Sequence, residues 1–111
     1  MAKKSKRKLT DEALQLVAQR FKVLSEPVRL KLLTVLEEGA QNVGELVRLT
    51  GQSQANVSKH LATLVGARMV GRRKEGLNAY YFICDPEILE LCDLMCHRLE
   101  SEFAARKSPF A

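Results

Sequence analysis

The sequence predicts one mainly α-helical domain, an α+β fold with five helices and a two-stranded β-hairpin. The chain has 111 residues, which is the size of one ordinary domain. Apolar residues make up 46% of the chain, and they recur at helical spacing in the segments predicted as helices. The exception is a pair of segments on either side of Glu75-Gly76, which is typical of two strands joined by a hairpin turn.

The first two helices are predicted to follow each other with almost no linker. The first covers residues 9–24, with Thr10 as its N-cap and two acidic residues in its first turn. Ser25 is expected to cap the second helix, because Pro27 follows and proline is tolerated in a first turn. Gly39 is expected to end this second helix.

The third and fourth helices are separated by a tight turn. A short helix over residues 43–49 leads into Thr50-Gly51-Gln52, and Ser53 is expected to cap the helix that follows. The apolar residues of this fourth helix form a stripe that predicts a buried side. The side chains expected on its exposed side are Gln54, Asn56, Ser58, Lys59 and His60.

The hairpin is predicted from strands over residues 69–74 and 77–84, and the last helix from Glu87 to about Ala105. One side of this last helix is too apolar to face water in a monomer of this size, which favours a two-fold partner. The alternative is that the stripe only covers the core of its own chain. The stripe consists of Ile88, Leu91, Cys92, Met95, Leu99 and Phe103.

The order of these elements predicts a winged helix-turn-helix. Two helices joined by a tight turn, the second carrying small polar side chains, form the helix-turn-helix, and the hairpin that follows forms the wing. We expect this DNA-binding and dimerisation domain to cover residues 9–105. Residues 1–8 are predicted to be a disordered basic arm, and residues 106–111 a flexible tail.

The net charge of +5 is distributed unevenly along the chain. Residues 1–8 carry five basic residues and no acid, and residues 46–74 carry six basic residues and no acid. The remaining two stretches are both net negative. A block of this length inside the folded region without a carboxylate points to a polyanionic partner, and with the predicted fold that partner is double-stranded DNA.

Ten residues are candidate DNA contacts. Gln and Asn can pair bidentately with adenine, Ser and His offer donors and acceptors, and Lys and Arg bind phosphate. A solvated helix face is the alternative, but it does not explain the missing acids. The candidates are Gln52, Ser53, Gln54, Asn56, Ser58, Lys59 and His60 at the fourth helix, and Arg72, Arg73 and Lys74 in the hairpin.

Two motifs carry a resemblance to a known family. The sequence FKVLSEPVRL (residues 21–30) and the sequence SQANVSKHL (residues 53–61) resemble those of the ArsR/SmtB family of bacterial metalloregulatory repressors. The resemblance covers roughly residues 12–103. It implies a homodimer formed through the first and last helices, a repressor that binds an imperfect palindromic operator, and an inducer that weakens DNA binding.

The inducer sites of that family are only partly matched here. Asn42-Val43-Gly44 stands where arsenic and cadmium sensors often carry Cys-x-Cys, so that site is absent. The positions that match the zinc-type site on the last helix are Asp85, Glu87, Arg98 and Ser101, so that site is lost too. The cysteine that a sulfur-sensing subgroup places on the second helix is also missing.

Three cysteines near the last helix remain as candidates. Cys92 and Cys96 lie one helical turn apart, and Cys84 ends the second hairpin strand and could fold back towards them. Three thiolates suit a soft ion such as arsenite, antimonite, cadmium or lead. Two alternatives stay open. The cysteines could sense persulfide or thiol oxidation, or they could be inert packing residues in a regulator without a cysteine-based inducer.

The sequence also argues against several other classes of protein. It contains no Cys-x-x-Cys, no nucleophile elbow and no phosphate-binding glycine loop, so we expect no enzyme and no cofactor required for DNA binding. No apolar run is long enough to span a bilayer, and the basic start is not a secretory signal, so we expect no membrane partner. The odd number of cysteines favours reduced thiols and a cytoplasmic location.

Overall fold

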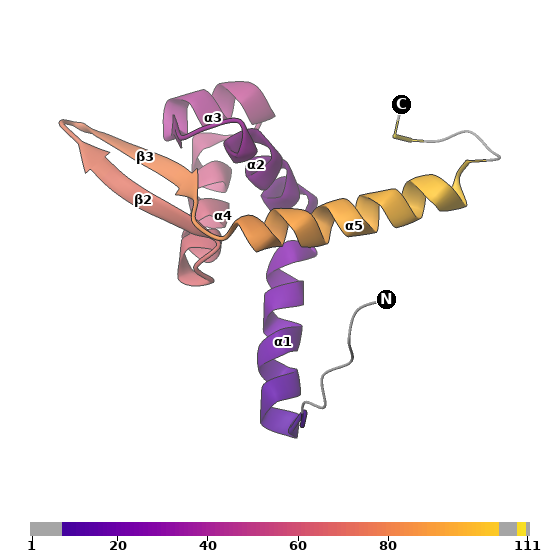
Figure 1. The fold of residues 1–111 in the computed structure, drawn as a ribbon. Coiled ribbons are helices and arrows are strands. Elements are labelled where there is room, and N and C mark those ends of the chain that lie inside the picture. The colour runs from indigo at the N-terminus through magenta and orange to yellow at the C-terminus, as the bar shows by residue number, and fades with distance from the viewer. Residues whose placement is uncertain (1–7, 105–108, 111) are drawn as a thin grey trace.

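The structure is a computed structural model that describes residues 8–104 and 109–110. The predicted basic arm, except Lys8, and most of the predicted tail lie outside these residues. The described part forms five helices and a three-stranded antiparallel sheet (Figure 1). The helices are α1 (Asp11–Leu24), α2 (Pro27–Glu37), α3 (Val43–Thr50), α4 (Gln54–Gly66) and α5 (Pro86–Glu102); the strands are β1 (Gln41–Asn42), β2 (Val70–Glu75) and β3 (Asn78–Ile83).

Side-chain caps begin four of the five described helices, all except α2. The Thr10 hydroxyl accepts a hydrogen bond from the Ala13 amide at 3.1 Å, and the Ser53 hydroxyl accepts one from the Asn56 amide at 3.1 Å, as predicted. The prediction for Ser25 is wrong. Its hydroxyl donates backwards to the Lys22 carbonyl of α1 at 2.7 Å, so Ser25 ends α1 and does not cap α2.

The hairpin forms as predicted, with its turn one residue further along. β2 pairs with β3 in the antiparallel sense from Val70 opposite Ile83 to Glu75 opposite Asn78. The two turn residues are therefore 76–77, and Gly76 has the positive φ of +64° that favours glycine. Strand β1 was not predicted, because two residues between helices are too short to show a strand pattern.

The end of α4 leads directly into the wing. The Met69 amide donates to the Leu64 carbonyl at 3.1 Å, and the Arg68 amide donates to the Val65 carbonyl at 2.9 Å. These two bonds form a Schellman motif, which requires a left-handed residue between the helix and the next segment. That residue is Arg68, with a φ of +62°.

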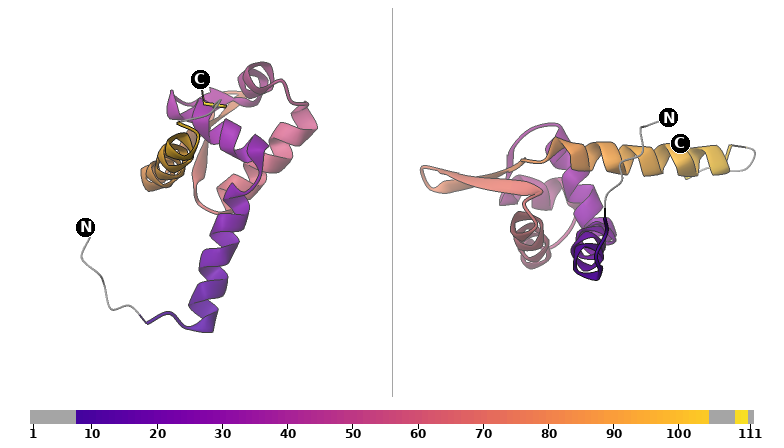
Figure 2. Two further views of the ribbon diagram at one scale, coloured as in Figure 1. Left: turned by 90° about the vertical axis from the view of Figure 1, so that its right-hand side faces the viewer. Right: turned by 60° about the horizontal axis from the view of Figure 1, so that its bottom comes forward.

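The hydrophobic core lies between α2, α3, α4 and the start of β2. The buried apolar residues of the described chain are Leu32, Leu33, Leu36, Leu46, Val57, Leu61, Leu64, Ala67, Met69 and Val70. Neither α1 nor α5 contains a buried residue. Both helices project from the body of the molecule, on a different side from the wing (Figures 1 and 2).

Candidate nucleic-acid interface

The turn between α3 and α4 is held by its own backbone and one hydroxyl. Gly51 has a φ of +73°, and its amide donates to the Val47 carbonyl at 2.9 Å. The buried Thr50 hydroxyl donates to the Leu46 carbonyl at 2.6 Å and accepts from the Gln52 amide at 3.3 Å. The turn therefore fixes where α4 begins and which way its first residues point.

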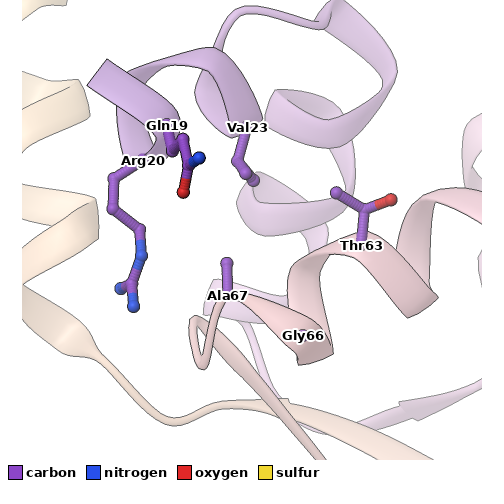
Figure 3. Close-up of a pocket in the computed structure, with 6 residues that line it drawn as sticks. All are labelled: Gln19, Arg20, Val23, Thr63, Gly66 and Ala67. Atoms are coloured by element: carbon purple, nitrogen blue, oxygen red, sulfur yellow. The ribbon is translucent and has the colours of Figure 1, made fainter. Parts of the chain in front are cut away.

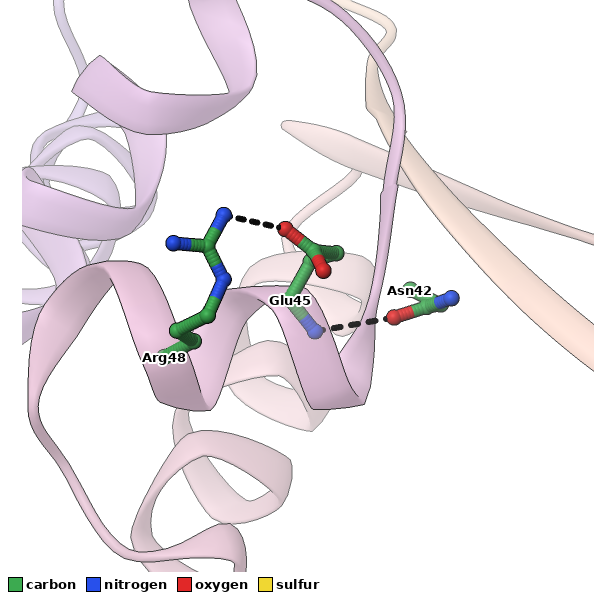
Figure 4. A network of polar contacts seen from close by, with 3 residues as sticks. All are labelled: Asn42, Glu45 and Arg48. Carbon is green, nitrogen blue, oxygen red and sulfur yellow. Dashed lines mark hydrogen bonds and ion pairs between the residues drawn. The ribbon is translucent and has the colours of Figure 1, made fainter.

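At the beginning of α3, the carboxylate of Glu45 neutralises one basic residue of the stretch 46–74. The Asn42 side chain accepts from the Glu45 amide at 2.9 Å, and the Glu45 carboxylate binds the Arg48 guanidinium at 2.7 Å (Figure 4). This hydrogen bond and the charge of Arg48 lower the pKa of Glu45 below its ordinary value. Arg48 is thus already paired with an acid inside the folded domain.

One side of α4 is buried and the other is polar. Val57, Leu61 and Leu64 are completely buried, so the opposite side of the helix faces solvent. Near its beginning, the Asn56 amide group donates to the Gln52 side-chain oxygen at 2.7 Å, which holds these two amides together. The exposed residues around this pair are Ser53, Gln54, Ser58 and Lys59.

His60 does not lie on the exposed side, and this prediction is wrong. It is 5% exposed because it lies three residues after the buried Val57 and next to Leu61. Its Nδ1 is 3.1 Å from a guanidinium nitrogen of Arg29 on α2. Burial lowers the pKa of His60, and the positive charges of Arg29 and Lys59 lower it further. His60 is therefore a neutral interior residue and not a candidate base contact.

The wing holds its arginines against aromatic rings on β3. The Arg72 Nε donates to the Tyr81 hydroxyl at 3.2 Å, and the guanidinium lies 6.0 Å from the centre of that ring. The Arg73 guanidinium lies 5.6 Å from the centre of the Phe82 ring and binds Glu75 at 2.7 Å. These aromatic partners were not predicted from the sequence, although the pairing of β2 with β3 indicates them.

The three predicted cysteines are not brought to one place. Cys84 is exposed at the end of β3, and its thiol donates to the Arg68 carbonyl at 3.2 Å. Cys92 and Cys96 lie on α5 and line an apolar groove of about 590 Å³ between α1, α2 and α5. Among the described residues, no three His, Cys, Asp or Glu side chains are close enough to hold a metal ion. The three-thiolate cage within one chain is therefore not formed, because Cys84 faces the start of the wing.

The two groove cysteines differ in their surroundings. Cys92 is half-buried and Cys96 is exposed. Burial raises the pKa of the Cys92 thiol, and the neighbouring Cys96 and Asp93 raise it further. Cys92 is therefore mostly protonated at neutral pH, and a soft ion that binds it must displace a proton.

The helices that border the groove expose apolar side chains. On α1, Leu14, Val17 and Phe21 are 45–53% exposed and lie on one face at helical spacing. On α5, Leu94 and Met95 are more than 60% exposed. These are the two helices that the sequence analysis expected to form a dimer interface.

Comparison with known proteins decides the family. Residues 26–71 match the family described as "Bacterial regulatory protein, arsR family". The uncharacterised HTH-type transcriptional regulator Rv0081 of Mycobacterium tuberculosis is 37% identical over 78 residues, which cover 69% of this chain and 68% of the relative. The chain belongs to the ArsR family. The prediction that it is a transcriptional regulator and not an enzyme is confirmed by this membership.

Solved structures of ArsR-type regulators share the fold. The crystal structure of Rv0081 superposes with a TM-score of 0.77 at 31% identity and covers 86% of this chain and 97% of the other. The homodimeric winged helix-turn-helix domain of Mb0332 from Mycobacterium bovis gives a TM-score of 0.74 at 28% identity and covers 94% and 95%. The predicted winged helix-turn-helix is thus confirmed.

A relative with a named role is the probable mercury resistance operon repressor of Streptomyces lividans. It is 38% identical over 74 residues, which are 67% of this chain, and the chain spans 59% of that relative.

In the described part of this ArsR-family chain, no helix is long and apolar enough to cross a membrane.

Proposed function

We propose that this ArsR-family protein is a homodimeric repressor that binds an imperfect palindromic operator and releases it when a thiophilic ion binds Cys92 and Cys96. One observation carries the DNA-binding part of the proposal. At the start of the second helix of the helix-turn-helix, Gln52 of the turn is paired with Asn56 of α4, and Gln54 and Ser58 are exposed beside them.

These side chains match the chemistry of base recognition. Amide groups of Gln and Asn can donate to and accept from adenine in the major groove. Lys59 is placed to bind phosphate, and the start of a helix is a favourable place for an anion. The wing carries Arg72, Arg73 and Lys74 on its exposed surface, where they would reach backbone phosphates or a minor groove. Two copies related by a two-fold axis would read the two halves of a palindrome.

The DNA-binding part is tested by fluorescence anisotropy with DNA from upstream of the protein's own coding sequence. Asn56→Ala should weaken specific binding by about 5- to 150-fold, since a bidentate base contact contributes about 1–3 kcal/mol. Lys59→Ala should weaken binding to all DNA sequences alike. It should also reduce the number of counterions released on binding, measured from the salt dependence of affinity, by about one. Lys31→Ala, an exposed lysine on α2, is the matched control and should change neither. Equal affinity of wild-type and Asn56→Ala protein for operator would contradict base recognition by α4.

The inducer part depends on two thiols one turn apart in an apolar groove. Both Cys92 and Cys96 line this groove, which supports their binding one soft ion, and apolar surroundings favour a complex in which thiolates neutralise the ion. Two thiolates satisfy a two-coordinate ion, and the mercury resistance repressor among the relatives supports mercury(II) as such an inducer. Arsenite, antimonite, cadmium and lead would need a further donor, supplied by Cys84 after a rearrangement or by a second copy of the chain.

The inducer part is tested by titrating the anaerobic protein–DNA complex with mercury(II), arsenite, antimonite, cadmium, lead and a persulfide donor. We expect at least one soft ion to release DNA from the wild type but not from Cys92→Ser or Cys96→Ser. Cys84→Ser is the matched control and should respond like the wild type to a two-coordinate ion. Release by the persulfide donor alone would show that the protein senses persulfide and not a soft ion. No release by any titrant would show that the thiols are packing residues.

A further inference from the structure

One guanidinium connects the end of α1 with the recognition helix. Arg29 lies in the first turns of α2 and is half-buried. Its Nε donates to the Val23 carbonyl of α1 at 2.7 Å, and its Nη2 lies 3.5 Å from the Lys22 carbonyl. Its Nη1 lies 3.1 Å from the Nδ1 of His60 on α4. Three helices therefore meet at one side chain.

We call these contacts of Arg29 with the end of α1 and with His60 the Arg29 link. The sequence explains why the end of α1 needs the hydrogen bond from Arg29. The Val23 carbonyl is one of the last four of α1, and in a continuing helix it would accept from the amide four residues later. That residue is Pro27, which has no N–H. Arg29 supplies the missing donor, and its positive charge is favourable at the end of a helix. The planar guanidinium holds the carbonyl and the imidazole through two different nitrogens at fixed spacing, whereas a lysine offers only one nitrogen.

The α4 side of the link sets the protonation state of His60. Because the guanidinium only donates, Nδ1 of His60 must accept, so its proton is on Nε2 and the ring is neutral. The charged groups that act on the ring are Arg29 of α2, Lys59 of α4 and Glu26 just before α2. Burial and the two cations lower the pKa of His60, against the smaller opposing effect of Glu26. A proton added at Nδ1 would remove the acceptor and place two cations side by side.

Next to this link, α1 and α4 are not fully packed against each other. Gln19, Arg20 and Val23 of α1 face the C-terminal part of α4 across a hollow of about 290 Å³ (Figure 3). Side chains do not fill this space, so apolar packing contributes little to the orientation of α4 against α1 here. The Arg29 link is a polar connection between α1 and α4 beside this hollow.

We propose that Arg29 and His60 are positioning residues that hold α4 in its DNA-binding orientation relative to α1, and that protonation of His60 opens the link and weakens operator binding. The proposal rests on the proposed function, because it assumes that α4 reads DNA. It gives the protein a response to acidification that needs no cysteine. Since α1 is also a candidate dimer helix, the same link would transmit a change at the dimer interface to the recognition helix.

Three variants distinguish an effect of the Arg29–His60 hydrogen bond from an effect of side-chain packing. His60→Asn keeps an acceptor near the position of Nδ1 and cannot titrate, so it should stay within about threefold of wild-type affinity for operator at pH 7.5. His60→Leu fills the space but leaves Arg29 without an acceptor, and Arg29→Lys keeps the charge without the fork. Both should weaken binding by about tenfold or more while the dimer stays intact by size-exclusion chromatography. Full affinity in both variants would overturn the proposal.

The decisive readout is the pH profile of operator affinity at constant ionic strength, from pH 8 to pH 5.5. Wild-type affinity should fall several-fold as the pH decreases, although added positive charge alone would strengthen DNA binding. His60→Asn should not show this fall. His97→Asn is the matched control, because His97 is exposed on α5, 3.9 Å from Glu100 and away from α4, and the operator affinity of this variant should fall as in the wild type. The same fall in His60→Asn, or an increase in the wild type, would overturn the proposal.

A measurement without DNA separates this proposal from the proposed function. If neither the wild type nor any variant binds upstream DNA at any pH, the proposed function is rejected. The link is still tested by NMR titration of His60 in the free protein. Arg29→Met should raise the pKa of His60, because one of the positive charges that lower it is removed. An unchanged His60 titration would overturn the link, whatever the protein binds.

Discussion

The unit that we propose to read bases and the two projecting helices are built in different ways. The reading unit, α2 to α4 with the wing, contains all of the fully buried apolar side chains of the described chain. Helices α1 and α5 are longer, with 14 and 17 residues, yet neither has a buried residue. Leu16 of α1 and Leu94 of α5 are at least 60% exposed.

This difference separates what one chain can stabilise from what needs a second copy. The reading unit has its own core, so its shape does not depend on an interface. The apolar faces of α1 and α5 bury little within one chain, and covering them with a partner removes that surface from water. An inducer acting at the groove beside these helices would therefore act on the less constrained region, while the reading unit keeps its own core.

The largest effect is expected in the core of the reading unit. Leu61→Ala should lower the free energy of unfolding by about 2–5 kcal/mol, because Leu61 is completely buried and the change leaves a cavity. Leu77→Ala at the exposed wing tip is the control and should stay within about 0.5 kcal/mol. Urea unfolding monitored by circular dichroism measures both. Similar losses in the two variants would contradict the assignment of the core.

The next effect should appear in assembly and not in folding. Met95→Glu places a charge in the apolar groove and should weaken dimerisation by about 1.5–3 kcal/mol, the contribution of a buried methionine, with the helix content preserved. Glu90→Ala on the same helix is the control and should dimerise like the wild type. Size-exclusion chromatography over a dilution series distinguishes the two. A Met95→Glu dimer as stable as the wild type would place the interface elsewhere.

Substituting two glycines of the reading unit should change the stability of the protein by smaller amounts and in opposite directions. Gly51→Ala should destabilise the protein by about 1–2 kcal/mol, because its φ of +73° is unfavourable for a residue with a Cβ atom. Gly66→Ala should stabilise it by up to about 1 kcal/mol, since it lies in α4 and no atom is within 4 Å of the added Cβ. Thermal unfolding of both variants checks the signs. A stabilising Gly51→Ala would be inconsistent with the helix-turn-helix turn.

The smallest effect is a pH dependence of stability inside the reading unit. The pKa of His60 is lowered in the folded state, so between that lowered value and the ordinary value of 6.5 the unfolded chain binds more protons. The contribution of neutral His60 is therefore fully present above about pH 6.5 and is lost as the pH falls through the lowered pKa. His60→Asn should remove a fraction of the pH dependence of the unfolding free energy between pH 7 and pH 5. An unchanged dependence would show that His60 does not titrate with folding.

Local chemistry could be predicted from the sequence, and contacts between distant segments could not. The caps at Thr10 and Ser53 depend on residues three positions away, and the helix-turn-helix depends on adjacent helices. His60 was misplaced because polar character suggested exposure, whereas Arg29, 31 residues earlier, makes its burial favourable. The position of Cys84 depends on its contact with Arg68, 16 residues earlier, which no spacing rule indicates.

We expect a second copy of the chain to cover the apolar faces of α1 and α5. Sedimentation velocity of the reduced wild-type protein at micromolar concentration measures its mass in solution. The expected result is one species of twice the chain mass of 12.5 kDa, which dissociates only on strong dilution. A single species of 12.5 kDa across the concentration range would contradict it, because the exposed apolar faces of α1 and α5 would then need another explanation.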